Sequence, residues 1–216
     1  WVGASGQDWD DNTNWSDTSG GAGGFSYPVA GDTAVFDANG NNNITLDAAV
    51  SAAAITNTGG YTGTFTTSNN TITLTGSFQW DGGIFTAGSS TINVGGNWDS
   101  SGGTFTYGTS TVNLTETGNL TTPGTNMQAY FYDLSLAASG KTTTMLSHAG
   151  TAGTLTLSGG TLTDAANSYA FTCAPDNSGD TAATATSAST VTINLFFFVA
   201  GNLSANENML IGPGDF

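Results

Sequence analysis

The sequence contains no arginine and only one lysine, Lys141, against 16 acidic side chains, which gives a formal net charge of -15 at pH 7. Nucleic-acid binding requires clustered basic side chains that displace counterions from phosphates, and this chain has none to cluster. An anionic membrane surface repels a protein of this charge. The composition therefore argues against nucleic-acid and membrane partners, and it leaves cations, neutral glycans and further copies of the chain.

Cysteine, histidine and long apolar runs are also scarce. Cys173 is the only cysteine, which excludes an intrachain disulfide and a multi-cysteine metal cluster. His148 is the only histidine, and no Gly-x-Ser-x-Gly motif supplies a nucleophile beside it. The longest apolar run, 195–200, is too short to cross a bilayer, so we expect no membrane insertion. Because the sequence starts at Trp1 without a signal peptide, we expect a processed or trimmed, soluble chain.

What the sequence has in abundance is threonine and glycine. Charged residues make up only 8% of the chain, far below the usual share of about 25%, so the polar surface must be mostly uncharged. The 38 Thr and 31 Gly residues favour strands and turns and disfavour helix interiors. A hydrophobic content of 38% is sufficient for a packed interior in a chain of 216 residues. The composition predicts an all-β protein.

Three copies of a repeat follow one another at a constant interval. The copies cover 63–74, 83–94 and 103–114, and each begins with Gly-x-Phe-Thr. Each copy ends in alternating polar and apolar residues, as in Thr71-Ile-Thr-Leu74, which is the period-two pattern of a half-buried strand. Polar turns separate these residues from the Phe-containing segment. Each copy therefore predicts two short strands.

Two architectures are compatible with this repeat. It could form one coil of a parallel β-solenoid, or a pair of strands in an antiparallel β-sandwich. We favour the solenoid (β-helix-like), with coils of about 20 residues, because constant spacing lets Phe65, Phe85 and Phe105 stack in one internal column. Strands of a sandwich vary more in length and lack this identity from coil to coil.

Composition divides the chain into three segments. Residues 1–58 combine Trp1, Trp9 and Trp15 with Asp, Asn and Gly, which is typical of an aromatic N-terminal cap, followed by the first strands. Residues 59–174 hold the solenoid repeats. Residues 175–216 begin with an Ala/Thr/Ser-rich stretch, which we interpret as a loop before a C-terminal strand that could serve in assembly.

Several segments carry a family likeness. They include Trp1-Val-Gly-Ala4, Asp32-Thr-Ala-Val-Phe-Asp-Ala-Asn39, the repeat 103–114 and Gly153-Thr-Leu-Thr-Leu-Ser-Gly-Gly-Thr-Leu162. These segments resemble repeat-rich extracellular β-solenoid proteins of bacteria, adhesin-like surface proteins that are also met in association with phages. The resemblance covers about residues 1–163. It implies an extracellular or cell-surface location and a structural or adhesive role, and it brings no catalytic motif.

These observations predict a non-enzymatic extracellular structural protein, a self-assembling surface or filament subunit. The alternative is an adhesin or glycan-binding module, in which an exposed Trp80 or Trp98 would stack on sugar rings, although the repeat-like placement of both favours the core. A polysaccharide-degrading β-helix enzyme is less favoured. A hydrolase needs two carboxylates at a defined separation, and no spacing among the Asp residues singles out a pair. We therefore predict no catalytic residue.

One loop has the alternating oxygen ligands of a calcium site. Asp8, Asp10, Asn12 and Asn14 supply carboxylate or amide oxygens at every second position. An EF-hand loop requires Gly where Thr13 stands and a distal Glu, and both are missing. A looser oxygen cage for Ca²⁺ and a solvated loop of Asx turns are the two interpretations.

Sequons for N-linked glycosylation begin at six positions, namely Asn14, Asn43, Asn69, Asn113, Asn119 and Asn202. A chain so rich in Asn, Ser and Thr produces sequons by composition alone. Modification at these sites is therefore a hypothesis that depends on an N-linked pathway in the host.

The C-terminal segment offers a candidate self-association element. It consists of Leu195, Phe196, Phe197, Phe198 and Val199, which are apolar on both faces of the predicted strand and must be covered on both. The segment could insert into the core of its own domain, or it could pair with another copy at an open strand edge. We favour pairing between copies, because no other apolar run in the chain is so continuous.

The variant Phe197→Asp tests this hypothesis. A carboxylate placed between packed strands is costly to bury, so the variant is expected to lose assembly while remaining a folded monomer. Sedimentation velocity of wild type and variant, with circular dichroism as the folding control, measures the change. A variant that still forms assemblies of native size would contradict the hypothesis.

Overall fold

The computed structural model describes residues 1–3, 8–124, 129–136, 138–157, 160–164, 169 and 171, and the backbone of 172–173 and of strands at 182–185, 191–194, 198–199, 202–205 and 209–211. Every strand pairing in these residues is parallel, and the strands wind as a β-solenoid. The predicted solenoid is confirmed, and the antiparallel sandwich is wrong. Contacts divide the chain into two compact units, unit 1 with residues 1–94 and 99–110, and unit 2 with residues 95–98 and 111–216.

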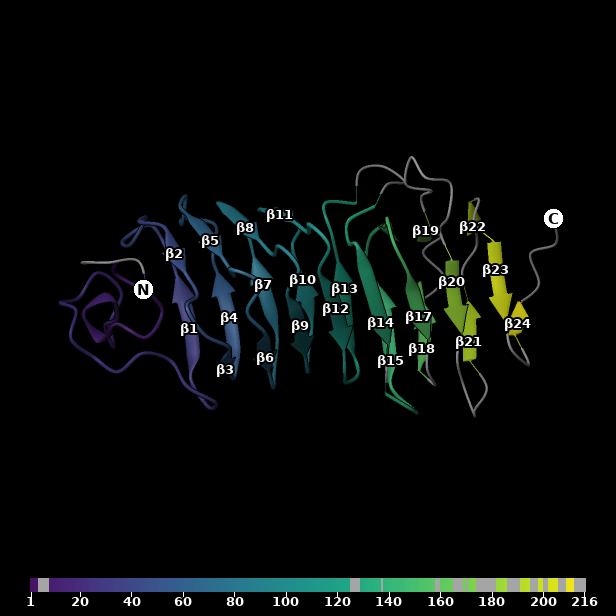
Figure 1. Cartoon of the computed structure of the whole chain (residues 1–216), viewed down its shortest axis with the longest axis horizontal. Helices are drawn as coiled ribbons and strands as arrows, with labels where there is room; N and C mark the ends of the chain where they lie inside the picture. Colours follow the sequence, from purple (N-terminus) through teal and green to yellow (C-terminus); the bar gives the residue numbers. More distant parts are fainter. Residues whose placement is uncertain are drawn as a thin grey trace. The chain divides into compact units, whose positions relative to one another are not determined.

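Unit 1 has three faces, each a ladder of parallel strands. The first face holds β1 (Thr33–Phe36), β4 (Ala54–Asn57) and β7 (Phe78–Trp80), which lie side by side in Figure 1. The second holds β2 (Ile44–Thr45), β5 (Thr64–Thr66), β8 (Ile84–Thr86) and β11 (Thr104–Thr106). The third holds β3 (Val50–Ala52), β6 (Ile72–Leu74) and β9 (Thr91–Val94). The short 3-10 helix η1 (Asn12–Asn14) precedes these strands, and β10 (Trp98–Asp99) spans the division between the units.

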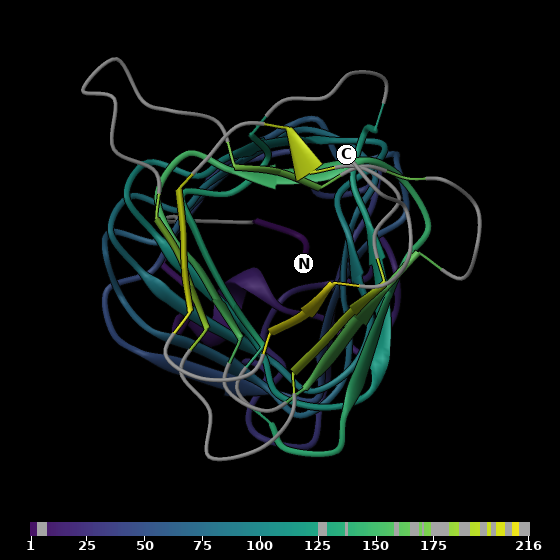
Figure 2. The ribbon, with the colours of Figure 1, turned by 90° about the vertical axis from the view of Figure 1, so that its right-hand side faces the viewer.

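Unit 2 is wound in the same way, and Figure 2 shows its strands on three sides of the coil. One ladder holds β13 (Gly118–Thr121), β15 (Thr142–Met145), β18 (Thr161–Thr163), β21 (Val191–Asn194) and β24 (Met209–Ile211). Another holds β12 (Thr111–Leu114), β14 (Asp133–Leu136), β17 (Leu155–Leu157), β20 (Ala182–Ala185) and β23 (Asn202–Ala205). The third holds β16 (Ala149–Thr151), β19 (Phe171–Cys173) and β22 (Phe198–Val199). In the part of the chain that the structure describes, no helix has the length and apolar character needed to cross a membrane.

In the second face of unit 1, the strand register pairs equivalent residues of successive repeats. Phe65 pairs with Phe85 and Phe85 with Phe105, so equivalent positions of successive repeats meet. The rings of Phe65 and Phe85 stack with centroids 4.7 Å apart at 12°, and those of Phe85 and Phe105 lie 5.7 Å apart at 32°. The predicted internal column is therefore confirmed. Trp80 packs edge-on against Phe65 and Phe85, with ring centroids 5.8 and 5.2 Å away.

Coil length is constant only inside the repeats. Ile72 pairs with Ile92, its equivalent in the next repeat, whereas Leu162 pairs with Ile193, which lies much further along the chain. Strand pairing fixes the register of the three faces, and the connections between strands absorb the difference in length. The coil length predicted from the repeat is thus a property of the repeats and not of the whole chain.

Three tryptophans cover the start of the aromatic core in unit 1. Trp1, Trp9 and Trp15 are all buried, and the Trp15 ring lies 5.2 Å from that of Trp1 and 4.8 Å from that of Trp9. Trp15 also meets Phe36, and Trp9 meets Phe65, at centroid distances of 5.9 and 6.1 Å. Each indole N–H donates to a backbone carbonyl, so the polar edges of these large rings are buried without loss of hydrogen bonds.

The variant Phe85→Ala tests how far the fold depends on the aromatic column. Phe85 is fully buried, so truncation is expected to lower the free energy of unfolding by about 3–5 kcal/mol. The control is Ile84→Ala on the same strand, where 42% of the side chain is exposed and the expected loss is below about 1 kcal/mol. Urea unfolding followed by tryptophan fluorescence measures both, and equal losses would show that the column is not the main source of stability.

Candidate functional site

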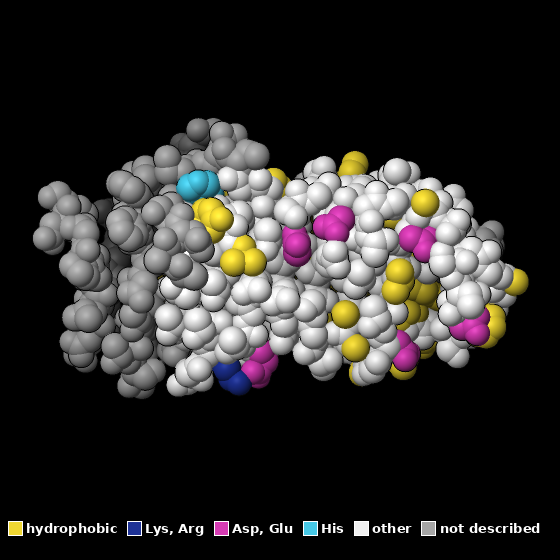
Figure 3. Space-filling model, turned by 180° about the vertical axis from the view of Figure 1, so that it is seen from behind, with side chains coloured by type: hydrophobic (Ala, Val, Ile, Leu, Met, Phe, Trp, Pro, Cys, Tyr) yellow, Lys and Arg dark blue, Asp and Glu magenta, His cyan; other side chains and the backbone are white. Residues whose placement is uncertain are grey.

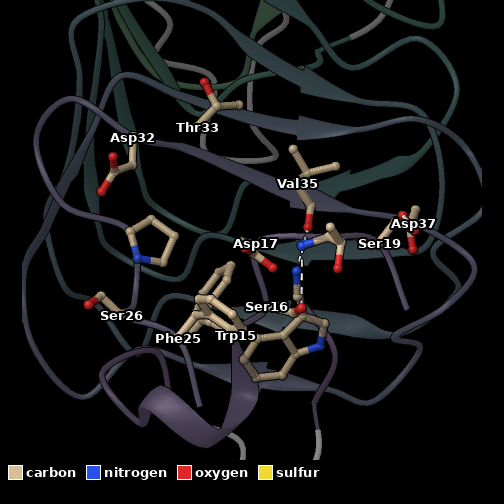
Figure 4. A pocket seen from close by; sticks show the side chains of 13 residues that line it. Trp15, Ser16, Asp17, Ser19, Phe25, Ser26, Asp32, Thr33, Val35 and Asp37 are labelled. Atoms are coloured by element: carbon tan, nitrogen blue, oxygen red, sulfur yellow. Dashed lines mark hydrogen bonds between the residues drawn. The ribbon is translucent and has the colours of Figure 1, made fainter. Parts of the chain in front are cut away.

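A pocket of about 490 Å³ lies in unit 1 against the outer face of β1. Along β1 the side chains alternate, with Ala34 and Phe36 buried inside and Thr33 and Val35 exposed outside. Thr33 and Val35 therefore face the pocket, whose other walls come from 15–19 and 25–28 (Figure 4). Trp1 also lines the pocket, so the site joins four segments that are separate in the sequence.

The loop that carries Phe25 is held to the start of the chain by backbone hydrogen bonds. The Gly24 and Phe25 N–H groups donate to the carbonyls of Asn12 and Trp15, at 2.9 and 3.1 Å. The Tyr27 N–H donates to Asn12 Oδ1 at 3.1 Å. A Cβ atom on Gly23 would overlap the Thr13 carbonyl oxygen, so this approach requires glycine. The loop is fixed, yet 46% of the Phe25 side chain stays exposed.

Three aspartates line the pocket, and they differ in their surroundings. Asp37 accepts hydrogen bonds from Ser19 Oγ at 2.5 Å and from the Asn39 N–H at 2.8 Å. The Ser19 bond is the main cause that holds the pKa of Asp37 below its ordinary value. Asp32 accepts from the Val29 N–H at 3.1 Å, and Asp17 is exposed.

The lining set contains no Lys, Arg or His side chain. Three aspartates against the single amino group of Trp1 leave the pocket negative, so it repels phosphate, sulfate and carboxylate groups. Its carboxylates can accept hydrogen bonds from a ligand, and its hydroxyl groups can donate or accept them.

The predicted calcium residues lie around η1, where two of them have partners inside the protein. Asn14 is buried and its Nδ2 donates to the Asp8 carbonyl at 3.1 Å, while Asn12 Oδ1 accepts from Tyr27. The side chains of Asp8 and Asp10 are exposed. Among the described residues, no group of three or more His, Cys, Asp or Glu side chains is placed to hold a metal ion. Calcium at this loop stays a prediction.

Asp11, which sequence reasoning passed over, forms the N-cap of η1. Its carboxylate accepts from the Thr13 N–H and the Thr13 hydroxyl, at 2.9 and 2.6 Å. This is the Asx-turn pattern, and the Asp-x-Thr spacing was its signal in the sequence.

The sequons differ in exposure. Asn43, Asn69 and Asn119 are exposed, Asn113 is half-buried, and Asn14 is fully buried. The side chain of Asn202 lies outside the described residues. A glycan could not be attached at Asn14 in the folded protein, because its amide nitrogen has no access to solvent.

The self-association segment falls mostly outside the described residues. Leu195, Phe196 and Phe197 lie outside them, as do the side chains of Phe198 and Val199. The backbone of these last two residues forms β22, which pairs in parallel with β19.

Trp80 and Trp98 cannot stack on a sugar ring from solvent, because both are fully buried. Trp98 packs on Phe131 with centroids 5.3 Å apart. The preference for a core role is confirmed. Sequence reasoning missed two exposed aromatic rings, Phe25 and Tyr27, whose signal was their position shortly after the Gly-rich stretch 20–24.

The hydrogen bonds to Asp37 generate a prediction about acid stability. Because the pKa of Asp37 is lowered in the folded state, its contribution is fully present above the unfolded value of about 3.9 and is lost as the pH falls through the lower folded value. Asp37→Asn and Ser19→Ala are each expected to lose less stability than wild type on acidification below about pH 4. Urea midpoints between pH 2 and 7 measure the slopes. Parallel curves for all three proteins would contradict the assignment.

Comparisons of the chain with known protein families, with curated proteins and with solved structures found no match.

Proposed function

We propose that the chain is a non-enzymatic extracellular structural protein, a surface or filament subunit that joins copies of itself. The observation that carries the proposal is the contrast between the interior and the exterior of the coils. In unit 1, register-matched aromatic rings fill the interior, as in the column of Phe65, Phe85 and Phe105. The outward positions of the same strands hold threonine at Thr66 and Thr86. Such a coil can present a long, uncharged surface.

The exterior supports the same proposal. Figure 3 shows a face that is mostly uncharged and polar, with scattered acidic side chains and one basic side chain beside an acidic one. Lys141 forms an ion pair with Glu116, and both side chains are largely exposed. Because dissolved ions screen exposed charges, acidic subunits could approach one another with limited repulsion at physiological ionic strength.

Contacts at the first strands of unit 1 cover two strand edges. At the first strands, the Trp1 amino group donates to the Val35 carbonyl at 2.8 Å, and Asp8 forms a parallel bridge with Thr45. These contacts occupy edges that another chain would otherwise use. The segment that we propose for joining copies is the predicted C-terminal element 195–199, most of which lies outside the described residues.

A second candidate function is an adhesin or glycan-binding module. The observation that favours it is the pocket over β1, where an exposed aromatic ring and several carboxylates and hydroxyl groups meet. This candidate is compatible with a structural role, since a structural surface protein can also carry a binding site.

Sedimentation velocity and electron microscopy of the wild-type chain, in calcium and after chelation, test the first proposal. We expect assemblies larger than the monomer in calcium, and a higher melting temperature in calcium than in chelator, because an ion bound only to the folded state stabilises it. The double variant Asp8→Asn, Asp10→Asn should lose the thermal response. A chain that stays monomeric at high concentration in both conditions would refute the assembly proposal, and unchanged melting would refute the calcium site.

A further inference from the structure

The pocket over β1 has an apolar wall that solvent can reach. Phe25 and Val35 both line it, and they are 46% and 41% exposed. An exposed aromatic ring keeps apolar surface in contact with water, and a flexible loop could reduce this contact by folding the ring against the protein. In this protein the ring stays exposed, because hydrogen bonds to Asn12 and Trp15 hold the backbone of 24–27 in place. The Phe25 ring is therefore held at the surface by a loop whose backbone is fixed.

Polar groups surround this apolar wall. Asp17 and Asp32 offer carboxylate oxygens, and Ser26 and Thr33 offer hydroxyl groups, all on exposed side chains that line the same hollow (Figure 4). Asp37 is less available, because Ser19 and Asn39 already donate to it. The available groups are mainly acceptors, so a matching ligand must bring several hydrogen-bond donors.

The charge of the pocket limits the class of ligand that it can bind. The lining has three aspartates and no basic side chain, which disfavours any ligand with phosphate, sulfate or carboxylate groups. A bare metal ion would use the carboxylates and leave the apolar wall unused. A ring with one apolar C–H face and hydroxyl donors on its rim uses both parts of the pocket.

We propose that this pocket binds a single neutral sugar ring, which stacks on Phe25 and donates hydrogen bonds from its hydroxyl groups to Asp17 and Asp32. Val35 and Thr33 on β1 line the same pocket. The volume of about 490 Å³ lies in the range of small-molecule sites, which run from about 300 to 1,000 Å³. The proposal rests on the adhesin candidate and names its ligand class and its residues.

The experiment is a titration of the full chain with a panel of neutral methyl glycosides, namely those of glucose, galactose, mannose and N-acetylglucosamine. Trp1 and Trp15 line the pocket, so tryptophan fluorescence reports on it locally, and saturation-transfer NMR reports on the sugar. For one ring with few contacts we expect a saturable change with a Kd of about 1 mM for at least one glycoside.

Variants locate the binding. Phe25→Ala is expected to weaken binding about tenfold, whereas Phe25→Tyr, which keeps the ring, should retain it. Asp17→Asn and Asp32→Asn should each weaken it severalfold, because an amide replaces one acceptor oxygen with a donor. The matched control is Val29→Ala, an apolar side chain that is 54% exposed and does not line the pocket. Urea midpoints equal to wild type establish that each variant is folded.

Two outcomes would overturn the proposal. One is the absence of any saturable response to the whole panel, and the other is a Kd that Phe25→Ala leaves unchanged, which would place binding elsewhere. Titration with choline and with lysine methyl ester tests a cation site, and binding of these without any glycoside would replace the sugar by an organic ammonium ion. Sedimentation is measured separately, so failure of the sugar site and failure of assembly are distinguishable.

Discussion

The stacking of like residues across parallel strands is the interaction on which the rest of this structure depends. In-register pairing places Phe85 between Phe65 and Phe105, so each ring covers the next and none needs a partner from a distant part of the chain. A slip of one residue would turn every ring outward, because successive side chains of a strand point to opposite faces. The column therefore fixes the register of the coils as well as filling their interior.

An aromatic column has an end that must be closed, and the way unit 1 closes it shapes the pocket over β1. Trp9 and Trp15 cover Phe65 and Phe36, and each needs a carbonyl for its indole N–H. The Trp9 indole donates to the Pro28 carbonyl, which draws the loop containing Phe25 against the start of the chain. The pocket follows from this packing, because the loops that cover the core also stand beside the outer face of β1. Core closure and the candidate binding site are two consequences of one arrangement.

Electrostatic attraction contributes little to this fold. Lys141 and Glu116 form an exposed ion pair, a kind of contact that is worth at most about 1 kcal/mol. The chain carries a net charge of -15, so its carboxylates mainly repel one another, and among the described residues all of them except Asp164 are at least partly exposed. Burial of apolar rings and the parallel backbone ladders have to exceed this repulsion. Where hydrogen bonds hold a carboxylate in place, as at Asp37, the donors are neutral groups such as the Ser19 hydroxyl.

The strand pattern, the register of the repeats and the inward position of Phe65, Phe85 and Trp80 could all be predicted from the sequence alone. These features are encoded over a few residues, since alternation and a constant interval place side chains without reference to the rest of the chain. The sequence also argues against phosphate-bearing partners, because their recognition needs basic residues that the chain lacks.

Other features arise only through contacts between distant segments. The amide of Asn14 is buried against the Asp8 carbonyl, although the sequence pattern treated both residues as ligands of one ion. The long step from Leu162 to its partner Ile193 depends on the path of a connection, which no periodic pattern encodes. The pocket needs Asp17, Phe25 and Thr33 to meet, and their meeting follows from how the loops pack over the tryptophans. Local sequence specifies which side of a strand a residue faces, whereas long-range packing determines which loops become neighbours.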